Sequence, residues 1–94
     1  MLTRVVNMNV EPYDVRIDRR SHYGNSFVLG RDGNRQAVIE QHMALWRLRL
    51  ANERQRQTAL AMLQALKGKR LGCHCAPLPC HGNNYVTLIA EFCP

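Results

Sequence analysis

A short segment rich in cysteine and histidine lies between a predicted strand and a predicted helix near the end of the chain. Residues 73–82 (CHCAPLPCHG) hold three of the four cysteines and two of the four histidines. Residues 69–75 predict a strand in front of this turn, and residues 83–92 predict a helix behind it. Open α/β sheets usually place their ligands where a strand ends and a helix begins. The segment therefore favours an α/β fold with a site at this turn.

Two further strands are predicted near the start of the chain. Residues 3–9 are rich in valine, and residues 13–18 alternate between apolar and charged side chains, as half-buried strands do. Residues 19–33 are polar and contain several glycines, which predicts a long loop. Loops of this length inside a small domain are usually functional or disordered.

Apolar residues at helical spacing predict two helices between this loop and the last strand. The first begins after Asn34, a good capping residue, and fades near Asn52. The second covers about residues 55–66 and ends at Gly68. The complete order predicts a single α/β domain over residues 1–94. Its short sheet has at least one parallel strand pair and packs against three helices.

Size and composition narrow the class of protein. With 94 residues and 46% hydrophobic residues, the chain supports one modest core. It contains no apolar run of membrane-spanning length and no secretory leader pattern, so we expect no membrane partner and a cytoplasmic location. In that compartment cysteines are thiols or ligands rather than disulfides.

The charge favours anionic partners. The chain carries 13 lysines and arginines against 7 acidic residues, for a net charge of +6. Only Lys67 and Lys69 are lysines, so the excess consists of arginine. The planar guanidinium binds phosphate or carboxylate through two donors at once, which suits nucleotides, nucleic acid or an acidic protein surface.

One interpretation of the cysteine-rich turn is a zinc site. Cys73, Cys75, Cys80 and His81 would supply three thiolates and one imidazole, an accepted tetrahedral set. All four lie within nine residues, whereas structural zinc sites usually take pairs of ligands from two separated knuckles. The residue types favour zinc and the spacing does not.

A second interpretation is an anion pocket without a metal. Cys75 and Cys80 would line it, and His81 would donate to the ligand or orient it. Free backbone amides at the start of the last helix, together with nearby arginines, would supply the donors.

A third interpretation is covalent catalysis, with Cys80 or Cys75 as the nucleophile and His81 or His74 as the base. A cysteine at a helix start can have a pKa below the usual value of about 8.5. Because adjacent side chains diverge there, His81 is poorly placed to take the proton of Cys80, and His22 from the loop would be better placed.

Some of these residues also have a purely structural interpretation. Cys73 suits a place in the core beneath the last helix. Trp46 is predicted to anchor the core, and His42 falls at the boundary of the buried stripe of its helix. Cys93 has no predicted role.

The loop contributes a second unusual motif, residues 24–27 (GNSF). Gly24 allows a left-handed backbone, and the amide of Asn25 can bind backbone or ligand. Arg35 follows in the first turn of a helix, where the macrodipole disfavours positive charge. A cation in that position suggests a partner for Arg35.

Together these residues resemble a family of small phage and bacterial domains of unknown function, family 4326. A GNPF motif and a later CWC-x-P-x-x-CH motif mark this family. Residues 24–27 stand for the first motif, residues 68–82 carry the second, and Arg35 falls where the family's helix begins with an arginine. The resemblance covers most of the chain.

Two departures from the family pattern are visible. Ser26 replaces the proline of the first motif, and His74 replaces the tryptophan of the second. The resemblance implies a phage or prophage setting. It also implies that Asn25, Arg35 and the cysteine-rich turn belong to one site.

Our leading hypothesis is a small intracellular domain that binds a phosphate-bearing ligand such as a nucleotide, in the host cytoplasm if phage-encoded. The ligand-binding residues would be Gly24, Asn25, Arg35, Cys75, Cys80 and His81. The first alternative is a zinc-stabilised module that binds nucleic acid or a host protein through its arginines. The second is a cysteine-dependent enzyme that acts on a nucleotide-like substrate.

Overall fold

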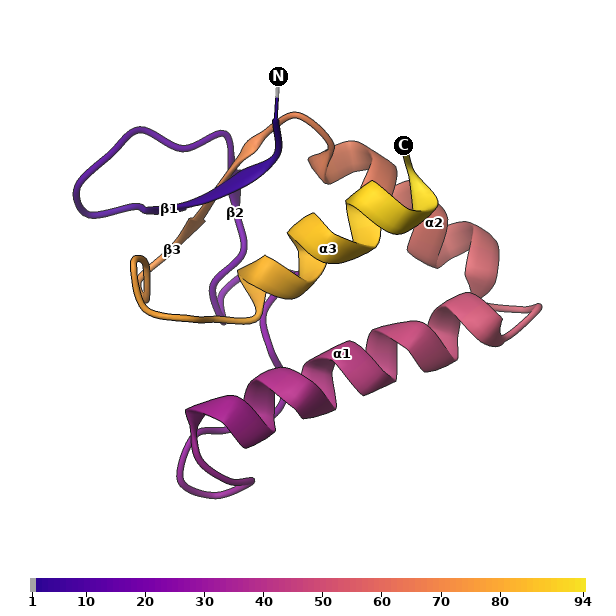
Figure 1. Cartoon of the computed structure of the whole chain (residues 1–94), viewed down its shortest axis with the longest axis horizontal. Helices are drawn as coiled ribbons and strands as arrows, with labels where there is room; N and C mark the ends of the chain where they lie inside the picture. The colour runs from indigo at the N-terminus through magenta and orange to yellow at the C-terminus, as the bar shows by residue number, and fades with distance from the viewer. Residues whose placement is uncertain (1) are drawn as a thin grey trace.

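A three-stranded parallel sheet and three helices form the fold, as described for residues 2–94 by a computed structural model (Figure 1). The strand order is β1-β3-β2, and β3 runs parallel to both neighbours. This arrangement confirms the predicted α/β class with a short parallel sheet and three helices. In chain order the elements are β1 (Arg4–Asn7), β2 (Val15–Arg16), α1 (Arg35–Ala51), α2 (Arg56–Leu66), β3 (Arg70–Cys73) and α3 (Gly82–Phe92).

All three strands are shorter than the sequence predicts. Strand β1 stops at Asn7 because the backbone turns there, and the Val10 amide donates to the Asn7 carbonyl at 3.0 Å. Strand β3 stops at Cys73, and the next turn is closed by the Leu78 amide donating to the Cys75 carbonyl at 2.8 Å. Cys75 therefore lies outside the sheet, and strand alternation does not align it with Cys73.

Helix α3 occupies the centre of the molecule. It contacts β1 and both other helices, and in Figure 1 it passes between the sheet and α1. Tyr85 and Leu88 on its inner face are buried. At Gly82 an added Cβ would lie 2.7 Å from Ile17 Cδ1 and 2.9 Å from Val5 Cγ2. The glycine lets the start of α3 contact the sheet side chains directly.

The helix ends follow the signals in the sequence. Asn34 caps α1, because its side-chain oxygen accepts a hydrogen bond from the Ala37 amide at 2.9 Å. Gly68 follows α2 with a φ of 74°, a left-handed conformation that suits glycine at a helix end. Trp46 is buried in the core as predicted. None of the helices among residues 2–94 combines the length and the apolar character that a membrane span needs.

A buried polar network includes His42, where the sequence predicts a boundary residue. Asn84 Nδ2 donates to His42 Nδ1 at 3.0 Å, which assigns the ring proton to Nε2. His42 Nε2 then donates to the Tyr85 hydroxyl at 3.2 Å, and that hydroxyl donates to the Tyr23 carbonyl at 2.7 Å. Because both ring nitrogens are satisfied, the histidine is buried rather than placed at the boundary.

Acid should destabilise the protein through this histidine. Burial lowers the pKa of His42 from 6.5 to about 3, so the unfolded chain binds this proton more readily than the folded protein. The stabilisation is complete above pH 6.5 and declines as the pH falls toward 3, by at most about 1.4 kcal/mol per pH unit for one proton. Urea unfolding at pH 7 and pH 5 should show a loss of about 1–2 kcal/mol in the wild type.

The variant His42→Gln should lose less stability than the wild type between these two pH values, whatever its stability at pH 7. His81, whose pKa burial also lowers, is present in both proteins, so the difference isolates His42. An equal loss in both proteins would contradict the assignment.

Candidate functional site

A cavity of about 340 Å³ opens at the carboxyl-terminal ends of β2 and β3. Its walls are formed by residues after β2, the loop that follows, the first turns of α1 and the turn between β3 and α3. Five of the six predicted ligand-binding residues line it, namely Asn25, Arg35, Cys75, Cys80 and His81. Residues far apart in the sequence are thus gathered around one space.

Gly24 and Asn25 shape the wall of the cavity. An added Cβ at Gly24 would lie 2.7 Å from the Asp18 carbonyl oxygen, so the glycine is needed for close backbone approach. Its φ is not left-handed, so the close approach, and not a left-handed turn, is what requires glycine here. Asn25 Oδ1 accepts from the Phe27 amide at 2.9 Å, and its Nδ2 donates to the Val38 carbonyl at 3.0 Å. Asn25 therefore holds the loop against α1.

Arg35 connects the start of α1 to the cysteine-rich turn. Its Nη1 donates to the Pro79 carbonyl at 3.2 Å. Within residues 2–94 it forms no ion pair with a carboxylate. The partner suggested by its position at a helix start is thus a backbone carbonyl, and the guanidinium keeps donors that can reach the cavity.

Two buried cysteines contact each other in the cavity wall. The sulfur atoms of Cys73 and Cys80 are 3.5 Å apart. The hydrogen bond with Cys80, together with the amides of Ala76 and Cys75, lowers the pKa of Cys73. The same pairing and burial raise the pKa of Cys80. The Gly82 amide favours the thiolate of Cys80, as a helix start can, but the neighbouring sulfur and burial outweigh it.

The amides at the start of α3 already have partners. The Gly82 amide donates to Cys80 Sγ at 3.3 Å. The Cys80 amide donates to Asn83 Oδ1 at 3.0 Å, and the Asn84 amide donates to the His81 carbonyl at 3.0 Å. The predicted use of these three amides for an anion does not fit the structure, because each is bonded within the turn.

His81 and Cys75 complete the predicted set. His81 Nε2 donates to the Ile17 carbonyl at 2.7 Å, and burial lowers the pKa of this ring. Cys75 is half-buried. Across residues 2–94, no three side chains of His, Cys, Asp or Glu are grouped as metal ligands. Zinc binding by Cys73, Cys75, Cys80 and His81 would need side-chain rearrangement, and it stays a prediction.

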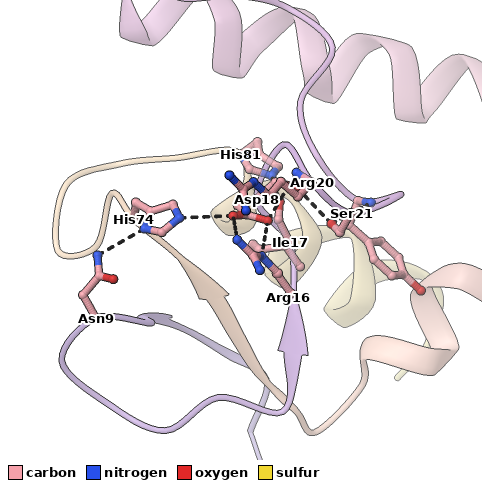
Figure 2. A network of polar contacts seen from close by, with 9 residues as sticks. Asn9, Arg16, Ile17, Asp18, Arg20, Ser21, His74 and His81 are labelled. Carbon is pink, nitrogen blue, oxygen red and sulfur yellow. Dashed lines mark hydrogen bonds and ion pairs between the residues drawn. The ribbon is translucent and has the colours of Figure 1, made fainter.

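A network of charged and polar side chains at the edge of the cavity is not predicted by the sequence analysis (Figure 2). Asp18 accepts two hydrogen bonds from Arg16, both at 2.7 Å, and one from His74 Nε2 at 3.1 Å. Asn9 Nδ2 donates to His74 Nδ1 at 3.1 Å. The alternating pattern of residues 13–18 places Asp18 on the charged face, which predicts an exposed residue. Instead only 10% of its side chain is exposed, because partners from β2 and the turn after β3 surround it.

Removing the charge of Asp18 should destabilise the fold. The bonds from Arg16, and then from His74, lower the pKa of Asp18 from 3.8 to about 2. Its contribution is therefore present above pH 3.8 and is lost as the pH falls through about 2. Asp18→Asn should lower the free energy of unfolding at pH 7 by about 1–3 kcal/mol, measured by urea unfolding.

Glu11→Gln is the matched control, because Glu11 pairs with Arg4 at an exposed position. Its effect should stay below about 1 kcal/mol. Equal effects of the two substitutions would show that the network around Asp18 adds nothing beyond a surface ion pair.

The fold defines a small α/β domain with a cavity at the carboxyl ends of parallel strands. The chain belongs to the family described as Domain of unknown function (DUF4326), which matches residues 2–91. This confirms the family predicted from the sequence.

A phage protein is among its relatives. The chain is 40% identical over 83 residues to an "Uncharacterized 12.4 kDa protein in nrdA-td intergenic region" of Enterobacteria phage T4. The alignment covers 87% of this chain and 72% of that protein. No solved structure matches the chain. The predicted relationship to phage proteins is therefore confirmed, and neither comparison assigns an activity.

Proposed function

We propose that the cavity binds a small phosphate-bearing ligand of the nucleotide class. The observation that carries this proposal is the set of arginines in the cavity wall, Arg19, Arg20 and Arg35. Within residues 2–94, none of the three forms an ion pair with a carboxylate. Five other arginines do so, namely Arg4, Arg16, Arg31, Arg47 and Arg70.

The unpaired charge supports an anionic ligand. Asp18 also lines the cavity, but its carboxylate is bonded to Arg16 at two oxygens. The three arginines therefore bring positive charge to the cavity wall that no carboxylate pairs with among residues 2–94. A phosphate would bind them through charge-assisted hydrogen bonds, and a planar guanidinium suits this contact.

The rest of the wall suits a flat apolar group. Phe27, Leu29, Val38 and Ile39 line the cavity beside the arginines. A nucleobase is flat and largely apolar on its faces, and it stacks on aromatic and aliphatic side chains. The volume of about 340 Å³ is near the lower end of the range of about 300–1,000 Å³ for small-molecule sites. A mononucleotide therefore suits the cavity better than a dinucleotide.

Thermal unfolding with a panel of nucleoside monophosphates, their nucleosides and inorganic phosphate tests the proposal. A ligand at ten times its Kd adds about 1.4 kcal/mol to the free energy of unfolding, which raises Tm by about 5–10 °C in a domain of this size. Arg35→Ala should weaken binding by about 10- to 100-fold, the value of a charge-assisted hydrogen bond.

Arg56→Ala is the matched control. Arg56 is exposed at the start of α2, outside the cavity wall, and its loss should leave the Tm shift unchanged. The proposal is wrong if no phosphate-bearing compound raises Tm. It is also wrong if Arg35→Ala and Arg56→Ala reduce the shift equally.

The zinc-stabilised alternative makes a different prediction. Structural zinc contributes directly to folding, so its removal lowers stability. Because the predicted ligands are not grouped as a metal site among residues 2–94, we expect a chelator to leave Tm unchanged within about 1 °C. Stoichiometric zinc in the purified protein, with a fall in Tm on chelation, would select the alternative. Binding to nucleic acid would then weaken steeply with salt.

A further inference from the structure

Cys73 and Cys80 form a sulfur pair that the proposed ligand site does not use. Cys73 is the last residue of β3, and Cys80 lies two residues before α3. Their sulfur atoms are 3.5 Å apart, and the side chains belong to the buried core. Both residues also line the cavity. The pair is thus packed against the core on one side and borders an open space on the other.

We propose that Cys73 and Cys80 are a redox-active dithiol that closes to a disulfide when a hydroperoxide enters the cavity. A disulfide bond is about 2.05 Å long, so the two sulfur atoms need to approach by about 1.5 Å. A small rotation of each side chain covers this distance. The two cysteines flank the turn of residues 74–79, and their sulfur atoms already face each other, so closure needs no change in the order or pairing of the strands and helices.

The size of the oxidant follows from the burial of the sulfurs. Cys73 is 2% exposed and Cys80 is 3% exposed, so a bulky disulfide such as oxidised glutathione cannot approach them in line. The cavity gives a small hydroperoxide a route to both residues. The substrate class is therefore a hydroperoxide, and hydrogen peroxide is its simplest member.

The chemistry balances with the peroxide as the two-electron oxidant. The thiolate of one cysteine attacks an oxygen of hydrogen peroxide, the O–O bond breaks, and a sulfenic acid and hydroxide form. The second cysteine then attacks the sulfenic sulfur as a thiolate, and the S–O bond breaks as the disulfide forms. The two thiol protons leave in the two water molecules produced. The dithiol is oxidised and the peroxide is reduced.

A redox role agrees with the compartment expected for the protein. In a reducing compartment, disulfides are rare and are mostly transient, catalytic or redox-sensing. A pair already in contact closes without unfolding, and a small thiol reductant that enters the cavity can reopen it by exchange. The inference is independent of the identity of the anionic ligand, because it rests only on the sulfur atoms and their access.

Intact-mass analysis of a variant with only these two cysteines tests the proposal. Cys75→Ser and Cys93→Ala together leave Cys73 and Cys80 as the remaining thiols. The double variant is needed because peptide mapping of the wild type cannot tell which cysteines pair. Trypsin leaves all four cysteines on one fragment after Arg70. After a small excess of hydrogen peroxide, we expect a mass lower by two hydrogen atoms, loss of both free thiols, and complete recovery with dithiothreitol.

Matched controls replace one member of the pair. Cys73→Ser and Cys80→Ser in the same background should gain oxygen and lose no pair of hydrogens. The wild type gives a second measurement should the double variant fold poorly, because its free thiols should fall from four to two. Oxygen addition without hydrogen loss in the double variant would overturn the proposal. Bound zinc that protects both thiols from peroxide would overturn it as well.

Discussion

The parallel arrangement of β3 between β1 and β2 is the constraint on which the site depends. In a parallel sheet the carboxyl ends of all strands meet at one edge, so the segments that leave those ends must share the same space. Here Asn9 follows β1, Asp18 follows β2 and His74 follows β3, and hydrogen bonds join the three side chains (Figure 2). The cavity opens beside this network. Its position is therefore determined by strand order, and the loops supply only its lining.

The sequence predicts the helices better than the strands because the helix signals are local. Asn34 caps α1 from three residues away, and Gly68 ends α2 by its own backbone conformation. The strand lengths depend on where the chain turns and on which strand lies alongside, so propensity alone extends them too far. The burial of His42 escapes prediction for the same reason. Its partners Asn84 and Tyr85 are 42 and 43 residues away, and no local pattern reveals them.

The sequence motifs predict which residues line the cavity more successfully than they predict what each residue does there. Motif residues from the loop after β2, the start of α1 and the turn after β3 line one cavity. Yet Asn25 is bonded to the backbone on both sides of its amide, so it positions the loop. Asp18 follows an alternating pattern that indicates exposure, and its partner His74 is 56 residues away. A buried carboxylate of this kind becomes visible only when the strand order is known.

The cavity wall contains two chemically different sets of side chains, the arginines and the paired cysteines Cys73 and Cys80. Because the amides of Cys80 and Gly82 are bonded inside the turn, the donors that the proposed anion would use are the guanidinium groups in the cavity wall. Arg19 and Arg20 line the cavity and are exposed, so their guanidinium groups are open to a ligand. The paired sulfurs are buried, and their state changes with an oxidant rather than with the anion. Oxidation would leave the guanidinium groups in place, while it would remove the thiolate that the lowered pKa of Cys73 favours and change the shape of the cavity wall at that residue.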